Sequence, residues 1–171
     1  MFNTSSSFKF TPEFQKELLS DTKEREGETY SKYFVFPSLE PKEINSDLKK
    51  YVVNSEDKFK ELMTLKMKIS IEGGSHTGKS ILAKYLANQL SEDYTVLFLT
   101  EDSFAPKNIK NIVKYALQSE FGDDVDVDEF LQLDKEKKIL IVDNNDKVDK
   151  EKWNSFLNEY IESPLQESNT L

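Results

Sequence analysis

Residues 67–90 decide the fold, and they read MKISIEGGSHTGKSILAKYLANQL. Apolar and polar residues alternate over 67–72, which predicts a β-strand. The next eight residues, 73–80, fit the pattern G-x-x-x-x-G-K-S. Apolar residues then recur at helical spacing, so a helix is expected to begin within the pattern. A strand, a glycine-bearing turn and a helix in this order predict a loop that holds phosphate at a helix N-terminus.

Each position of the pattern has a chemical reason. Gly73 and Gly78 allow a close backbone approach that a Cβ would block. Successive amides then point inward and cradle the β-phosphate. Lys79 is expected to reach the β- and γ-oxygens, and the Ser80 hydroxyl is expected to bind Mg²⁺. His76, the only histidine, is expected to lend its backbone amide, which is compatible with a side chain that faces solvent. The expected nucleotide-binding residues are Gly73, Gly74, Ser75, His76, Thr77, Gly78, Lys79, Ser80 and Ile81.

A second acidic site is predicted downstream, in the stretch KKILIVDNND. Residues 139–142 form a short, continuous apolar run, as a strand buried on both faces requires. Asp143 falls at the C-terminal end of that run, where ligands gather in open α/β sheets. Its carboxylate is expected to hold Mg²⁺, usually through water, opposite the Ser80 hydroxyl. The alternative is an aspartate that only caps the end of a strand.

Hydrolysis needs a further group, because an attacking water must be positioned and polarised, commonly by a carboxylate next to the metal-binding aspartate. Asn144 and Asn145 follow Asp143, and an amide orients water without accepting its proton. Asp146 is the nearest spare carboxylate and completes the candidate catalytic set with Lys79 and Asp143. An equally good reading makes Asp146 the N-cap, or the lead-in, of the next helix. Nucleotide binding is therefore expected, and turnover stays open.

Composition limits the other functions. The 171 residues carry 23 basic and 32 acidic side chains, a net charge of −9, which argues against a generic nucleic-acid or anionic-membrane surface. There is no cysteine, which removes disulfides and thiolate metal sites. No apolar run approaches the roughly 20 residues of a membrane span, and no signal peptide is recognisable. A cytoplasmic location and no membrane contact are expected.

The chain is expected to contain two parts, an N-terminal helical and extended segment over 1–66 and a nucleotide-binding domain over 67–171. In the first part, helices are predicted after Thr11 and after Ser55, each of which is a cap residue. In the second part, strands are predicted at 67–72, 94–100 and 138–143, with helices between them. That alternation indicates an α/β fold with a parallel sheet.

Three further signals concern the connecting segments. Apolar residues from Ile109 to Leu117 have helical spacing, and Gly122 is the predicted stop. A helix that carries Trp153 is expected to end by Pro164. The acidic stretch over 122–138 opens like a calcium loop, but Glu129 replaces the required glycine and the twelfth position is not glutamate. A solvated loop followed by a helix start is therefore expected there.

The loop GGSHTGKS and the strand ILIVD resemble the Walker A and Walker B motifs of P-loop nucleoside triphosphatases. One predicted strand separates the two, which resembles the class with an extra strand between the motif strands. Within it, the closest resemblance is to STAND-type signalling ATPases, relatives of AAA+ proteins, and it covers about residues 30–163. The segment YFVFPSLEP, residues 33–41, is similar to their YxFP-like segment, which implies a position near adenine. The resemblance implies a three-layer fold with a parallel sheet flanked by helices, and ATP or ADP with Mg²⁺ as ligands.

The chain departs from this family in two ways. STAND proteins usually carry two acidic residues in a row at the strand end, and here the second is Asn144. No fourth strand can be read before Leu171, and the sensor and winged-helix segments are missing, so an incomplete domain is expected. Protein partners or self-association are then expected through those C-terminal regions. Two alternatives remain, a small P-loop kinase or phosphotransferase and a non-hydrolysing scaffold. Arg25 is the only arginine, which speaks against the first because phosphoryl transfer commonly uses arginines.

Overall fold

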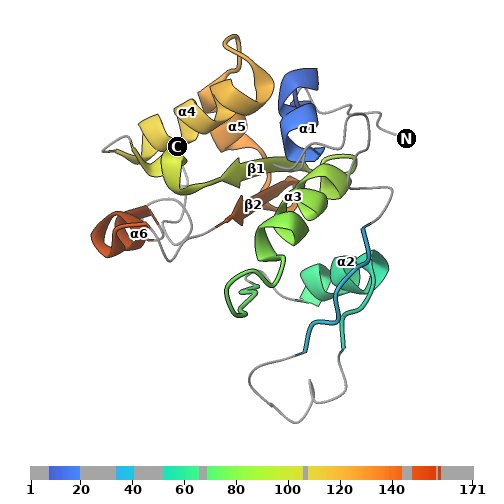
Figure 1. Cartoon of the computed structure of the whole chain (residues 1–171). Helices are drawn as coiled ribbons and strands as arrows, with labels where there is room; N and C mark the ends of the chain where they lie inside the picture. Colours follow the sequence, from blue (N-terminus) through green and yellow to red (C-terminus); the bar gives the residue numbers. More distant parts are fainter. Residues whose placement is uncertain are drawn as a thin grey trace, which may run out of the picture.

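The fold is built around two short strands rich in aliphatic residues, a composition that favours a pleated, buried surface. The computed structural model describes residues 8–19, 34–40, 52–65, 69–105, 108–143, 148–156 and 158. Figure 1 shows their arrangement. The elements in chain order are α1 (Pro12–Leu19), α2 (Glu56–Leu65), α3 (Lys79–Leu90), β1 (Thr95–Leu99), η2 (Glu101–Phe104), α4 (Ile109–Phe121), α5 (Val127–Gln132), η3 (Lys135–Lys137), β2 (Lys138–Val142) and α6 (Lys150–Phe156).

The two strands are parallel, and the register pairs Thr95 with Lys138 and Leu99 with Val142. One further backbone bond extends the pairing, because the Asp143 N–H donates to the Leu99 carbonyl over 2.8 Å. This confirms the strands predicted at 94–100 and 138–143 and their parallel direction.

Helices lie against both faces of this sheet. Every residue of β1 is buried, and successive side chains of a strand point to opposite faces. Leu97 and Leu99 therefore enter a core cluster with residues of α4, and Val96 and Phe98 enter a second cluster with residues of α3. Figure 1 shows the strands between the two helices. The described part of the chain is thus a small parallel sheet flanked by helices. In this part, no helix is long and apolar enough to cross a membrane.

The strand predicted at 67–72 is wrong for the residues that the structure describes, since 69–72 belong to no strand. The alternation on which the prediction rested is real, because Ile69 and Ile71 are half-buried while Ser70 and Glu72 are exposed. Both isoleucines pack against the α3 cluster. A strand also needs ladder hydrogen bonds to a neighbour, and no described residue pairs with this segment. Side-chain burial is therefore present without the backbone pairing that makes a strand.

The helix boundaries follow the predicted caps. The Thr11 hydroxyl accepts from the Phe14 N–H over 3.2 Å, and the Ser55 hydroxyl accepts from the Lys58 N–H over 3.4 Å. Helix α4 ends before Gly122, whose φ of 98° lies in the region that favours glycine. The starts of α1 and α2 and the stop of α4 are thereby confirmed.

The caps of α5 and α6 are both aspartates. Asp126 accepts from two amides at the start of α5, which confirms the loop and helix start predicted in the acidic stretch. Asp149 accepts from the first amides of α6, the Glu151 and Lys152 N–H groups, at 3.0 and 3.1 Å. The reading of Asp146 as the N-cap is therefore wrong, because Asp149 does that work. The rest of the helix predicted up to Pro164 lies outside the described residues.

Candidate functional site

The glycine-bearing loop leads directly into α3. Gly78 is the N-cap of that helix and has φ 84° and ψ 14°, and His76 also has a positive φ of 62°. The first helical bond runs from the Leu82 N–H to the Gly78 carbonyl over 2.9 Å. The amides before Leu82 have no acceptor within the helix, as at every helix start, and they are the groups on which an anion docks. The left-handed conformation explains why glycine stands at 78.

Thr77 closes the loop on itself, a role that motif reasoning missed. Its hydroxyl donates to the Gly74 carbonyl over 2.9 Å. A Cβ added at Gly73 would lie 3.0 Å from the same hydroxyl oxygen, so the loop is tight at this point. Threonine hydroxyls often bond nearby backbone groups in turns, and that habit is the only signal that the sequence offered.

The Lys79 ammonium lies over the loop rather than in solvent. It donates to the Gly73 carbonyl over 2.9 Å and to the Gly74 carbonyl over 2.7 Å. The cation is thus held at the mouth of the loop, next to the amides at the start of α3. Phosphate oxygens would compete for these donors with the two carbonyls, and an anion gains more from a cation than a neutral carbonyl does.

Ser80 and Asp143 meet although they are far apart in the sequence. The Ser80 hydroxyl donates to the Asp143 carboxylate over 3.0 Å. Ser80 comes from the first turn of α3, and Asp143 follows β2 and is only 8% exposed. The backbone bond from Asp143 to β1 fixes its position. The structure therefore brings together the two residues that the sequence assigns to Mg²⁺, whereas Asp146 lies outside the described residues, as do Asn144 and Asn145.

Hydroxyl and carboxylate oxygens are the ligands that Mg²⁺ prefers, so this donor pair fits the ion in kind. Mg²⁺ is usually held by one or two protein groups together with substrate phosphates and waters. The described residues contain no group of three or more His, Cys, Asp or Glu side chains that would hold a metal by themselves. The pair therefore suits a metal that arrives with a nucleotide better than one held permanently.

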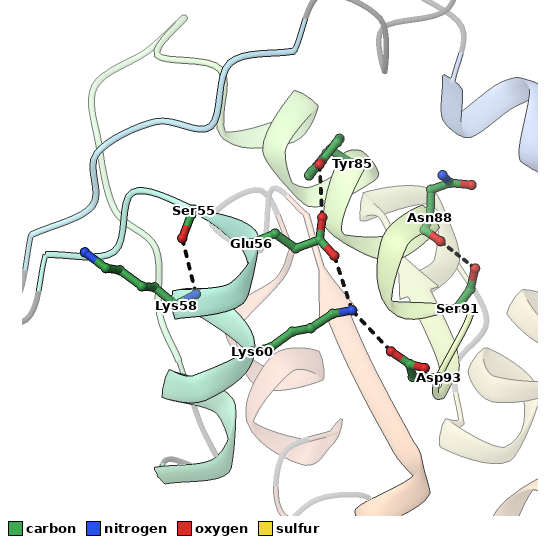
Figure 2. Close-up of polar contacts among 8 residues, drawn as sticks. All are labelled: Ser55, Glu56, Lys58, Lys60, Tyr85, Asn88, Ser91 and Asp93. Atoms are coloured by element: carbon green, nitrogen blue, oxygen red, sulfur yellow. Dashed lines mark hydrogen bonds and ion pairs between the residues drawn. The ribbon is translucent and has the colours of Figure 1, made fainter.

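The helix α3 that carries Lys79 and Ser80 is fastened to α2, the last helix before the loop (Figure 2). The Tyr85 hydroxyl donates to Glu56 over 3.1 Å, and the Lys60 ammonium lies 3.2 Å from both Glu56 and Asp93. Hydrogen bonds to Asp93 and Glu56 raise the pKa of Lys60, and burial is the main cause that raises the pKa of Tyr85. Phe34 stacks on Tyr85, with ring centroids 4.0 Å apart. The helices before and after the loop are thus clamped together, and this limits the freedom of the loop ends.

A shallow pocket of about 280 Å³ lies between η2 and α6. Its lining includes Phe104, Val148 and Lys152 but no residue of the loop. It lies beyond the carboxyl ends of both strands, at the sheet edge where Asp143 is found. Residues 73–78 of the loop are exposed, so phosphate would dock on an open loop rather than in this pocket.

Comparisons with protein-family models, with curated proteins and with solved structures found no match for this chain. Its function must therefore be argued from the residues and the geometry described above.

The backbone at Gly78 allows a first test. We expect Gly78→Ala to destabilise the protein by about 1–2 kcal/mol, because φ 84° forces a Cβ against the following carbonyl. Gly74→Ala is the matched control, because its Cβ would make only an ordinary 3.7 Å contact with Thr77. Urea unfolding of both variants measures the difference, and equal stability of the two would contradict the strained geometry at position 78.

Proposed function

We propose that the chain binds ATP through residues 73–81, with Mg²⁺ held between Ser80 and Asp143. The observation that carries the proposal is the position of Lys79, whose ammonium lies over the Gly73 and Gly74 carbonyls at the helix start. In the fuller form of the proposal, the domain has the three-layer P-loop fold and is the nucleotide switch of a STAND-like signalling ATPase. The sequence resemblance supports this form.

The described groups divide the work by chemistry. Amides of the loop and of the first turn of α3 accept the β-phosphate, and Lys79 turns from the carbonyls to the phosphate oxygens. Ser80 offers its hydroxyl oxygen to the metal, and Asp143 orients the hydroxyl or a metal-bound water. Bound Mg²⁺ would neutralise charge on the phosphates.

Calorimetry of the whole chain with ATP tests the proposal directly. Binding with a dissociation constant in the micromolar range is expected in the presence of Mg²⁺, with weaker binding in excess EDTA. ADP is expected to bind as well, because the loop mainly recognises the β-phosphate. If 1 mM ATP produced no heat and no shift in melting temperature, the proposal would fail.

A non-hydrolysing scaffold is the second candidate, and Asn144 is the residue that favours it. Nothing in an amide side chain accepts the proton of an attacking water. Release of inorganic phosphate over many turnovers separates the two candidates, because a scaffold binds ATP and returns it unchanged.

Restoring the acid at position 144 gives a prediction on turnover. We expect Asn144→Asp to raise the rate of ATP hydrolysis by roughly 10-fold or more, since a positioned general base contributes about 10²–10⁴-fold when fully effective. Asn145→Asp is the control, because it adds the same charge one residue further along. Equal rates in wild type and in Asn144→Asp would show that Asn144 is not what limits turnover.

A further inference from the structure

Glu120 is a carboxylic acid in the core of the protein. It is only 1% exposed and follows the apolar stripe of α4, one turn after Ala116 and Leu117. Its two carboxyl oxygens lie 3.0 and 3.2 Å from a single donor, the Phe98 N–H. Burial raises the pKa of Glu120 well above its usual range, and the hydrogen bond from Phe98 opposes this only in part. One donor shared by two oxygens satisfies a carboxylate poorly.

The Phe98 N–H points to the outer edge of β1, away from β2. Alternate residues of a parallel strand turn their backbone groups to opposite sides. Leu99 faces β2, because its carbonyl accepts from the Asp143 N–H, so Phe98 faces the other way. Glu120 therefore stands where a neighbouring strand would pair. Its hydrogen bond adjoins the backbone that holds Asp143.

The same residue also holds residues 8–19, which we call the N-terminal arm. The backbone carbonyl of Glu120 accepts from the Thr11 N–H over 2.8 Å. The next residue, Phe121, meets Phe8 and Phe10 with ring centroids 5.7 and 5.3 Å apart. Residues 120 and 121 thus join three segments, which are α4, the edge of β1 and the arm.

The charged groups on the elements packed around Glu120 lie at the surface. β1 carries none. Those on the arm, on α4 and on the turn after α4 are exposed, namely Lys9, Glu13, Lys16, Glu17, Lys110, Lys114, Asp123 and Asp124. Lys84 of α3, on the other face of β1, is only half-buried. Burial and the Phe98 N–H are the influences that act on the pKa of Glu120, with no contribution from these charges.

We propose that Glu120 is a proton-operated clasp, which in its neutral form holds α4, the edge of β1 and the N-terminal arm together and which loosens the arm when it ionises. A neutral carboxyl group is tolerated in an apolar core, whereas a carboxylate with one donor draws towards water. It cannot reach water without moving α4 or the arm, because both cover it. The proton lost on ionisation passes to solvent.

The direction of the pH effect follows from linkage. A folded-state pKa above the unfolded value of 4.5 means that the folded protein binds the proton more tightly. The stability from this group is fully present below pH 4.5 and is lost as the pH rises through the higher folded-state pKa. The clasp is therefore closed in mild acid and opens towards neutral pH.

Amide chemical shifts of the wild-type protein between pH 4 and pH 8 test the clasp. The Phe98 and Thr11 amides are expected to shift together, with one common midpoint above 4.5. In Glu120→Gln, which cannot ionise, both shifts should vanish. In Glu13→Gln, a change of an exposed carboxyl on the arm, both should remain.

Urea unfolding of the same variants gives a second readout. The unfolding equilibrium constant of wild type relative to Glu120→Gln should rise about tenfold or more between pH 4.5 and pH 8, one factor of ten for each unit of pKa difference. The proposal is overturned if the Phe98 midpoint lies at or below 4.5, or if the Thr11 amide does not follow Phe98. The wild-type titration decides these points even if the Gln variant does not fold.

Discussion

Lys79→Ala is expected to weaken ATP binding by about 100-fold or more while the fold stays intact. The ammonium makes two hydrogen bonds, to the Gly73 and Gly74 carbonyls, and is free to exchange both for phosphate oxygens. Hydrogen bonds to charged groups contribute about 1.5–3 kcal/mol each, so two of them amount to roughly 3–6 kcal/mol. Every 1.4 kcal/mol is about tenfold in affinity. Calorimetric titration with Mg²⁺ and ATP measures the loss.

Lys84→Ala is the matched control, because Lys84 lies on the same helix but outside the loop. It removes the same charge, so a general electrostatic effect would appear in both variants and a local one in Lys79→Ala alone. Far-ultraviolet circular dichroism should be unchanged in both. An unchanged affinity for ATP in Lys79→Ala would sink the phosphate-loop assignment.

Local and periodic signals predicted most of the described fold. The apolar runs of β1 and β2, the stripe of α4 and the cap residues of α1 and α2 are all readable within a few residues. The meeting of Ser80 with Asp143 was predictable for a different reason. A parallel sheet places strand ends on one edge, and that edge faces the start of α3.

Non-local pairing explains what the sequence did not reveal. Alternation at 69–72 predicted a strand, but a ladder depends on a neighbour that alternation does not specify. Glu120 continues an apolar stripe, and only its contact with Phe98, 22 residues earlier, shows why a carboxyl group stands there. Thr77 was read as one member of a motif, although its hydroxyl is what closes the loop.

The acidic stretch over 122–138 shows how composition conceals a core residue. It was read as a solvated loop and helix start, which its caps confirm, yet it contains Phe130, one of the largest fully buried side chains. Charged neighbours on both sides lower the local hydrophobicity, while a single helical turn is enough to bring one ring into the core.

Phe130→Ala is expected to cost about 3–5 kcal/mol of unfolding free energy, the usual range for a buried phenylalanine. The ring is 1% exposed and meets Phe8 of the N-terminal arm edge-on, with centroids 5.7 Å apart. The Lys138 ammonium lies 5.5 Å from the ring centroid and donates to the Phe130 carbonyl over 3.4 Å. Truncation removes the surface on which both the arm and the first residue of β2 rest.

Thermal unfolding measures this cost, and the melting temperature should fall by about 6–20 °C, given roughly 2–4 °C per kcal/mol for a chain of this size. Tyr115→Ala is the control, because this aromatic side chain on α4 is 54% exposed and its loss should change the unfolding free energy by no more than about 0.5 kcal/mol. Similar losses in the two variants would mean that Phe130 is not a core residue. A large loss in Phe130→Ala alone would show that the acidic stretch anchors α5 between the arm and β2.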